Sequence, residues 1–333
     1  MKAAIYPGKG QAIVIEDLPD PEPGAGEILI KVHRCGICGT DLSMTNGDAF
    51  DYGAGVQFGH EYAGKIIGLG KGVEGLKLGQ KISVLPSGAC GHCAGCDGGN
   101  HVMCRTGAGA MRGFAELARL PASLAIPLPD VLSMADGALI EPLAVSLYGV
   151  RQSGIRPGDA VLVLGGGTVA LYAIYWARRM GAGRIVAMSR SERRKDLCLA
   201  MGADAFIRFG ESEVGEVIEA LGGSPDIVYE AVGSEGMMAK AIMHAKIYGK
   251  IISLGFCTHA DPIMPALAAY KCVTMQFLVG YSMDEFIFIA DQMDKGHVDP
   301  KALITNEIPL LDLPDMMAAL RGSNTETKVH VLC

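Results

Sequence analysis

Residues 161–182 read VLVLGGGTVALYAIYWARRMGA and contain a strand, a glycine turn and a helix in direct succession. The apolar run 161–164 predicts a buried strand, and the periodic run 168–182 predicts a helix that ends near a glycine. Between them, the turn fits the pattern G-x-G-x-x-A with Gly165, Gly167 and Ala170. In this context the glycines let the backbone approach a pyrophosphate, and the free N–H groups of the helix N-terminus bind it. We therefore predict a dinucleotide site rather than a plain tight turn.

The chain after this stretch repeats the alternation of strand and helix. A further helix is predicted at 191–203, and apolar strands are predicted at 184–189, 226–232 and 249–256. Such alternation predicts a doubly wound parallel sheet with right-handed crossovers. One more helix is expected at 284–296, and the tail then continues as polar, proline-containing segments. A final strand at 328–333 is expected to return to the first domain.

The first 120 residues have a different pattern. Short alternating strands are predicted at 27–34, 61–70 and 80–86, separated by turns rich in glycine and proline. This pattern indicates an all-β region, such as a partly open barrel. Helical periodicity then appears at 133–153. Because the chain has 333 residues, two domains are expected.

Four cysteines with the spacing C-x2-C-x2-C-x7-C lie within fifteen residues: Cys90, Cys93, Cys96 and Cys104. Four thiolates this close together are typical of a closed tetrahedral site for one structural zinc ion. The alternatives are four reduced thiols without metal, or a DNA-binding finger. The finger is disfavoured because the stretch lacks a paired histidine motif and a basic helix. We therefore predict a structural zinc lobe.

A second set of possible metal ligands lies on either side of this lobe: Cys38, His60, Glu61 and Glu141. Cysteine, histidine and carboxylate together form the kind of open zinc site that keeps one position for water or substrate. Cys35 is a rival thiol for Cys38, and a buried glutamate could instead be held in a salt bridge.

The composition excludes several classes of partner. The net charge is −7 and 20% of the residues are charged, without the basic stripe that nucleic-acid binding requires. No apolar run reaches the roughly 18 residues of a membrane span, and the N-terminal segment resembles no signal peptide. We therefore expect a cytoplasmic protein, in whose reducing surroundings clustered cysteines bind metal or stay buried thiols.

The end of the second strand bears on the choice between NAD and NADP. An acidic residue there would bind the ribose 2′-hydroxyl of NAD, but the chain has Ser189 and Arg190, followed by Arg193 and Arg194. A hydroxyl and a guanidinium suit a 2′-phosphate. In the alternative interpretation, Ser191 caps the next helix and the arginines are solvated. The sequence favours NADP.

Several motifs together resemble the zinc-dependent medium-chain alcohol dehydrogenases over essentially the whole chain. They are CGICGTD at 35–41, GHEYAG at 59–64, the cysteine lobe, IEPLAV at 140–145 and the glycine turn. The resemblance implies a GroES-like catalytic domain at 1–150 and 287–333, with the zinc lobe at about 88–105. It also implies a Rossmann dinucleotide-binding domain at 151–286.

The resemblance assigns roles to individual residues. Cys38, rather than Cys35, would bind the catalytic zinc with His60 and Glu141, and Glu61 would be an alternate ligand. Asp41 would orient His60. The hydroxyl of Thr40 would pass a proton from the substrate oxygen, and Ser43, which replaces a histidine of many relatives, could continue that relay. The cofactor contacts are expected at Gly165, Gly167, Thr168, Val169, Ser189, Arg190, Arg194, Val232, Leu254 and Gly255.

We therefore expect reversible hydride transfer between NADP(H) and an alcohol, aldehyde or ketone, with two zinc ions per chain. The alternative enzymes are an NAD-dependent polyol or secondary-alcohol dehydrogenase and a zinc-free quinone reductase; a catalytically silent binding protein is the other class. The expected assembly is a homotetramer or a homodimer. Residues expected to line the substrate pocket are Phe50, Tyr52, Met111 and Leu143.

Overall fold

The computed structural model describes residues 1–46, 51–90, 92–104, 106–107 and 109–333. The chain forms two compact units. Unit 1 comprises Met1–Ala144 and Gly280–Cys333, and unit 2 comprises Val145–Val279. Phe50, one of the expected pocket residues, lies outside the described ranges. No helix in these ranges is both long and apolar enough to span a bilayer.

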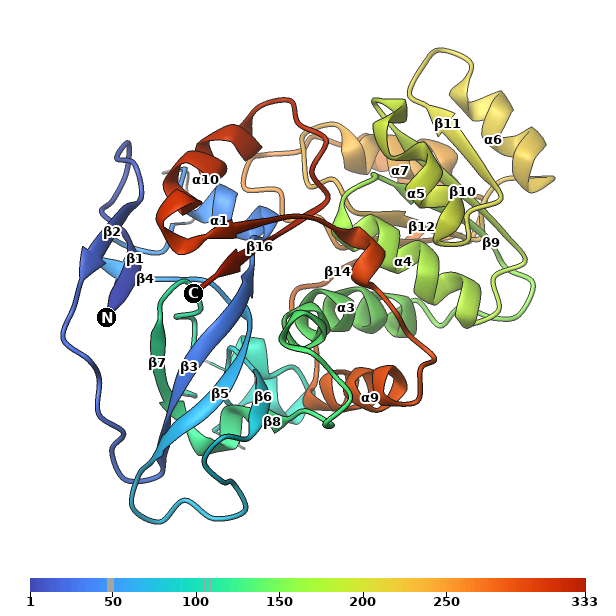
Figure 1. Cartoon of the computed structure of the whole chain (residues 1–333). Coiled ribbons are helices and arrows are strands. Elements are labelled where there is room, and N and C mark those ends of the chain that lie inside the picture. Colours follow the sequence, from blue (N-terminus) through green and yellow to red (C-terminus); the bar gives the residue numbers. More distant parts are fainter. Residues whose placement is uncertain (47–50, 91, 105, 108) are drawn as a thin grey trace. The chain divides into compact units, whose positions relative to one another are not determined.

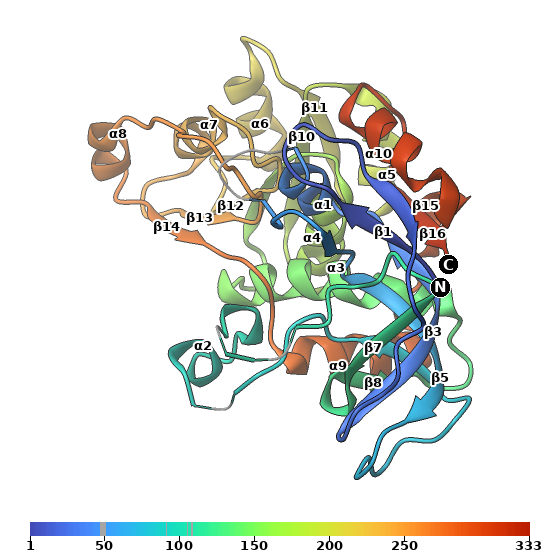
Figure 2. The same cartoon turned by 90° about the vertical axis from the view of Figure 1, so that its left-hand side faces the viewer.

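Unit 2 is built on a parallel six-stranded sheet, as predicted, with the order β11-β10-β9-β12-β13-β14 (Figure 1). The strands are β9 (Ala160–Leu164), β10 (Arg184–Ser189), β11 (Ala205–Arg208), β12 (Ile227–Glu230), β13 (Lys250–Ser253) and β14 (Thr274–Phe277). Figure 2 shows β14, in orange, as an outer strand of this sheet. Leu162, Val186 and Val228 of the inner strands are fully buried, as expected for strands covered on both faces.

The helices of unit 2 are α4 (Thr168–Arg179), α5 (Lys195–Ala200), α6 (Glu213–Leu221), α7 (Met237–His244) and α8 (Pro265–Tyr270). The single helix predicted at 191–203 is wrong in detail. A 3₁₀ turn, η3 (Glu192–Arg194), comes first, and α5 follows it. Arg194 has φ −113° and ψ 17°, which are not α-helical values, so the two turns are separate.

Unit 1 contains two sheets. The larger has the order β15-β16-β3-β5-β6-β8, and β7 also pairs with β3. Its strands are β3 (Glu27–Gly36), β5 (Glu61–Leu69), β6 (Lys81–Val84), β7 (Leu117–Pro121), β8 (Ala125–Pro127), β15 (Ile304–Pro309) and β16 (Lys328–Leu332). The smaller sheet contains β1 (Lys2–Tyr6), β2 (Val14–Asp17) and β4 (Val56–Gln57). The strands expected at 27–34, 61–70 and 80–86 are therefore confirmed.

The α-helices of unit 1 are α1 (Gly39–Met44), α2 (Ala94–Asp97), α9 (Met283–Asp294) and α10 (Leu313–Arg321), while α3 (Met134–Gln152) begins in unit 1 and continues into unit 2. The 3₁₀ turns are η1 (His101–Met103), η2 (Ala122–Leu124), η4 (Lys301–Leu303) and η5 (Leu310–Asp312). The expectation of polar, proline-containing segments in the tail did not include β15 or α10. Pro314 in α10 does not interrupt the helix because it lies in the first turn, where proline is tolerated.

The last strand of the chain joins the sheet next to the candidate metal ligands. In the antiparallel register of β16 and β3, His330 is opposite Gly36, and Gly36 is opposite Glu61 of β5. A Cβ atom at Gly36 would overlap the Glu61 carboxylate. The glycine therefore leaves room for the Glu61 side chain between the chain's first long strand and its last.

Candidate active site

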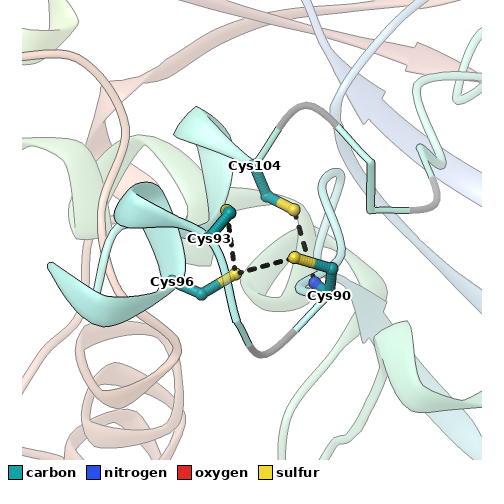
Figure 3. A group of neighbouring side chains, drawn as sticks. All are labelled: Cys90, Cys93, Cys96 and Cys104. Carbon is teal, nitrogen blue, oxygen red and sulfur yellow. Dashed lines mark hydrogen bonds between the residues drawn. The ribbon is translucent and has the colours of Figure 1, made fainter.

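The four lobe cysteines converge on one point (Figure 3). Cys90 precedes α2, Cys93 and Cys96 lie at its start and within it, and Cys104 follows η1. The Cys93 and Cys96 sulfurs are 3.6 Å apart, and those of Cys90 and Cys96 are 3.9 Å apart. All four lie within 4.8 Å of one another.

This geometry fits a zinc ion. A tetrahedral site with Zn–S bonds of about 2.3 Å requires sulfurs about 3.8 Å apart. The backbone N–H groups of Cys90 and Gly107 also donate to the Cys104 sulfur, at 3.3 and 3.1 Å. Such donors stabilise the thiolate form that binds metal.

Cys104→Ser is expected to lower the zinc content from two ions per chain to one, because serine replaces a strong ligand of the closed site. Elemental analysis of the purified protein would measure the loss, with Cys272→Ser, an exposed cysteine far from the lobe in sequence, as the control. Unchanged zinc content would refute the assignment of the lobe as a zinc site.

The second set of predicted ligands also converges. The possible ligand atoms of Cys38, His60 and Glu61 lie within 4.8 Å of one another. Cys38 is in the turn between β3 and α1, His60 directly precedes β5, and Glu61 is the first residue of β5. Glu141 of α3 is not in this tightest group, but its carboxylate is close enough for His60 and Glu61 to shift its pKa.

The rival thiol, Cys35, is not part of the group. It is fully buried, and its sulfur donates to the carbonyl of Gly36 at 3.8 Å. Burial raises its pKa well above the usual range, which disfavours the thiolate form. The structure therefore brings Cys38, and not Cys35, together with His60 and Glu61.

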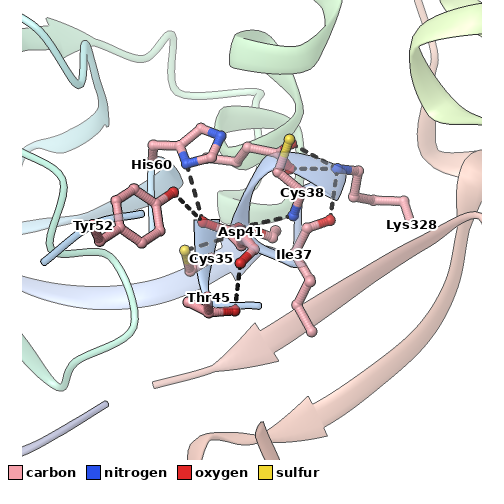
Figure 4. A network of polar contacts seen from close by, with 10 residues as sticks. Cys35, Ile37, Cys38, Asp41, Thr45, Tyr52, His60 and Lys328 are labelled. Atoms are coloured by element: carbon pink, nitrogen blue, oxygen red, sulfur yellow. Dashed lines mark hydrogen bonds and ion pairs between the residues drawn. The ribbon is translucent and has the colours of Figure 1, made fainter. Parts of the chain in front are cut away.

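Asp41 connects the elements that carry the ligands (Figure 4). Its fully buried carboxylate accepts a hydrogen bond from the Cys38 N–H at 2.9 Å and one from the Tyr52 hydroxyl at 2.8 Å. The Nδ1 atom of His60 lies 3.3 Å from the same carboxylate. The geometry agrees with a positioning role for Asp41 toward His60. Tyr52, expected in the pocket wall, is thus engaged in holding Asp41.

Lys328 on β16 was not among the predicted residues. Its Nζ lies 2.7 and 2.5 Å from the two carboxylate oxygens of Glu61. The same Nζ lies 3.0 Å from the carbonyl of Ile37 (Figure 4). Lys328 and Glu61 are almost fully buried. Burial lowers the pKa of Lys328, but the Glu61 carboxylate outweighs it, and the net pKa is raised. The pair is therefore a buried salt bridge between cation and anion.

Tyr281 is the other residue that was missed. It is buried beside Glu141, and burial together with that carboxylate raises its pKa well above the usual range. Burial also raises the pKa of Glu141 to about 7, with His60 opposing the rise and Glu61 adding to it. Tyr281 follows Gly280, whose positive φ of 76° favours a glycine, and a Cβ atom there would overlap the Val102 side chain. Gly280, which comes shortly before α9, was the one sequence feature that could have drawn attention to Tyr281.

The charges of the group fit a metal cation. Burial lowers the pKa of His60, yet the nearby Asp41 and Cys38 side chains outweigh burial and raise this pKa well above its usual value. Such a shift means that the surrounding anions favour a positive charge at this position. A cysteine, a histidine and carboxylates are the donors that catalytic zinc uses.

Thr40 and Ser43 are half-buried residues of α1, next to this group in sequence. Leu143, expected in the pocket wall, is fully buried, and Met111 is half-buried.

The predicted cofactor turn in unit 2 has the expected local structure. Gly165 has a φ of 123°, and a Cβ atom there would lie 3.2 Å from the carbonyl of Ala231. Gly167 is the N-cap of α4, which starts at Thr168 and Val169. The turn therefore presents backbone next to a helix N-terminus, the arrangement that binds a pyrophosphate.

The predicted selectivity residues lie around this turn. A Cβ atom on Gly166 would be 3.6 Å from the Cβ of Arg194 and 3.8 Å from the hydroxyl of Ser189, and Arg194 Nη1 donates to the Gly166 carbonyl at 3.4 Å. Arg190 is exposed. Ser191 occupies the N-cap position of η3 without a side-chain capping bond.

Three further predicted contacts follow neighbouring strands of the same sheet. Val232 comes two residues after β12 and is partly exposed, and its N–H donates to Glu230 at 2.7 Å. Leu254 and Gly255 follow β13 directly. A Cβ atom at Gly255 would overlap the backbone of Gly233, so the two loops meet closely at the carboxyl edge of the sheet.

Lys328→Met is expected to lower the free energy of unfolding by about 3–5 kcal/mol, because it leaves the buried Glu61 carboxylate without its partner. The matched control, Lys295→Met, breaks an exposed ion pair with Asp291 and should cost at most about 1 kcal/mol. Urea denaturation of both variants measures the difference. Equal midpoints would contradict a stabilising role for the buried pair.

Comparison with known proteins identifies the family. Residues 24–130 match the alcohol dehydrogenase GroES-like domain, and residues 168–294 match the zinc-binding dehydrogenase domain. The (R,R)-butanediol dehydrogenase of Bacillus subtilis (strain 168) is 32% identical over 99% of both chains. The chain belongs to the zinc-dependent medium-chain dehydrogenase/reductase family. It is therefore an oxidoreductase, and the predicted combination of a GroES-like domain and a Rossmann sheet is confirmed.

Other relatives and solved structures agree with this assignment. The sorbitol dehydrogenase of B. subtilis (strain 168) is 29% identical, over 99% of this chain and 97% of that protein. The crystal structure of the 2R,3R-butanediol dehydrogenase of B. subtilis has a TM-score of 0.88 at 30% identity, covering 100% and 99% of the two chains. A structure from Sinorhizobium meliloti 1021, named a zinc-binding dehydrogenase and bound to NADP, has a TM-score of 0.89 at 29% identity, with the same coverage.

Proposed function

We propose that this member of the family is an NADP-dependent alcohol dehydrogenase or carbonyl reductase with two zinc ions per chain. The observation that carries the proposal is the convergence of Cys38, His60 and Glu61, with Glu141 nearby, in a chain that also has a dinucleotide turn. The reaction is reversible hydride transfer between NADP(H) and an alcohol, aldehyde or ketone.

Zinc, when bound, would act as a Lewis acid on the substrate oxygen. Cys38, His60 and one of the two glutamates would hold it. The Lys328 ammonium lies against both Glu61 carboxylate oxygens, and the Asp41 carboxylate lies beside His60 Nδ1, where it would orient the ring. Glu141 is buried close to the same group, so its carboxylate is the other candidate for the third ligand.

Thr40 would exchange a proton with the substrate oxygen through its hydroxyl, and Ser43, water or a ribose hydroxyl would continue the relay. Thr40 lies two residues after Cys38 in the first turn of α1, so its side chain starts close to the metal ligands. A single hydroxyl at this place would contribute as a general acid and base.

Thr40→Ala is expected to reduce turnover at least tenfold while zinc content stays unchanged, because the variant loses the proton-transfer group and no metal ligand. Steady-state kinetics and elemental analysis of the same preparation measure both. Thr40→Ser, which keeps the hydroxyl, is the control and should retain most of the activity. Near-full activity of the alanine variant would refute the relay.

The preference for NADP over NAD is supported by Ser189, Arg190 and Arg194 around the turn, where no acidic residue follows the second strand. One solved neighbour holds NADP. Another, a short chain alcohol dehydrogenase from Escherichia coli CFT073 that is 25% identical, holds NADH. The two neighbours hold different cofactors, so the proposed preference for NADP rests on the residues of this chain.

Titration of the zinc-replete protein should give at least tenfold tighter binding of NADPH than of NADH, which is about 1.4 kcal/mol. The extra affinity would come from charge-assisted bonds to the 2′-phosphate. Nicotinamide fluorescence and quenching of the single tryptophan, Trp176, report binding. Equal affinities, or tighter NADH binding, would overturn the preference.

An NAD-dependent polyol or secondary-alcohol dehydrogenase is the second candidate. The specific observation in its favour is the likeness to the sorbitol and butanediol dehydrogenases. Both substrates named there are alcohols with more than one hydroxyl. Activity with NAD and a diol or polyol, without activity with NADP, would establish this candidate.

We further propose that residues 1–150 and 287–333 form the catalytic domain and 151–286 the cofactor domain. Assembly into a homotetramer, or a homodimer, would use the free edge of β14, beside which Tyr270 and Phe277 are exposed by 82% and 66%. An exposed apolar sheet edge is a common site of strand pairing. Light scattering would give the mass of the assembly. A cytoplasmic location stays a prediction.

A further inference from the structure

We propose that Arg208, which the family resemblance does not assign, is a further residue of the 2′-phosphate site and determines cofactor specificity together with Ser189 and Arg190. The inference rests on the proposed preference for NADP. Arg208 is the last residue of β11 and comes 18 positions after Arg190, so its proximity depends on the pairing of the strands.

The register of the sheet places Arg208 beside the predicted selectivity residues. In the parallel pairing of β10 and β11, Ser189 is opposite Arg208, and these are the last residues of both strands. Opposite residues of paired strands direct their side chains to the same face of the sheet. The Ser189 hydroxyl is on the side of the glycine turn, close to Gly166.

A hydrogen bond fixes the direction of the Arg208 side chain. Its Nε donates to the backbone carbonyl of Arg190 at 3.3 Å. The guanidinium therefore reaches across the carboxyl end of β10, where the adenosine ribose of a dinucleotide lies in this fold. In the described part of unit 2, no protein group accepts a hydrogen bond from its Nη atoms.

The position also suits an anion electrostatically. β11 is an edge strand of the sheet, and Arg208 is exposed at its end, so its charge is not buried against another strand. Arg190 follows β10 directly, and Arg194 approaches the turn from η3. A phosphate with nearly two negative charges would accept bonds from several guanidinium groups, which pair with phosphate oxygens in a bidentate manner.

The alternative is a purely structural role, in which the hydrogen bond from Arg208 to the Arg190 carbonyl only holds β11 next to β10. Arg184 offers a matched control, because it lies at the opposite, amino end of β10 and its Nη1 donates to the backbone carbonyl of Ala220 at 3.2 Å. Both arginines are exposed and each binds a backbone carbonyl. Only Arg208 is at the end where the cofactor would bind.

The test measures binding of two small probes to the zinc-replete protein by calorimetry. Adenosine 2′,5′-bisphosphate carries the 2′-phosphate, and 5′-AMP lacks it. Arg208→Gln should weaken binding of the bisphosphate at least tenfold and leave that of 5′-AMP unchanged. Arg208→Lys should give an intermediate loss, and Arg184→Gln should change neither.

The outcomes separate this inference from the proposed cofactor preference. If the unmodified protein prefers the bisphosphate and Arg208→Gln keeps that preference, the inference is overturned and the preference for NADP stands. An equal loss for both probes would also overturn it, since Arg208 would then only support the fold. If the unmodified protein shows no preference for the bisphosphate, the cofactor proposal fails and the inference fails with it.

Discussion

The salt bridge between Glu61 and Lys328 is the constraint on which the candidate metal centre depends. It joins β5 to the last strand of the chain across Gly36, in the interior of unit 1. It also balances charge, because Cys38, Glu61 and Glu141 would bring three negative charges to the site when ionised. A divalent zinc ion and the Lys328 ammonium together supply three positive charges. Without Lys328, a zinc site with two carboxylates would carry an excess negative charge, and the buried Glu61 carboxylate would lose its salt-bridge partner.

Asp41 is a second buried carboxylate that positions the candidate metal ligands. One buried carboxylate holds the backbone at Cys38 and the side chain of His60, and Tyr52 holds that carboxylate in turn. The α1 helix that contains it is also tied to the C-terminal region, because Arg321 donates to the Thr45 hydroxyl at 2.8 Å. The C-terminal segment of the chain thus supports two of the ligands from α10 and a third from β16. The centre in unit 1 therefore makes contacts with both the N-terminal and the C-terminal segments of the chain.

Local sequence patterns were sufficient to predict much of this structure. The strands of the parallel sheet, the glycine turn and the two ligand sets have short, specific motifs, and the structure brings those residues together. The missed residues have no motif of their own. Lys328 and Tyr281 reach the site only through strand pairing and a glycine turn far from Cys38 in sequence, and a lysine in a final strand usually faces solvent. Arg208 likewise has no motif of its own, because it lies opposite Ser189 only through the register of β10 and β11. The α10 helix was not predicted, and its Pro314 lies in the first turn, where proline is tolerated.

The most direct test of the central claim is X-ray absorption at the zinc edge of the Cys104→Ser variant, in which only the catalytic site should retain metal. The expected spectrum is that of a zinc ion with one sulfur ligand, from Cys38, and with nitrogen or oxygen ligands from His60, a glutamate and solvent. A spectrum dominated by sulfur, or a variant without zinc, would contradict the assignment of Cys38, His60 and the glutamates as an open catalytic zinc site.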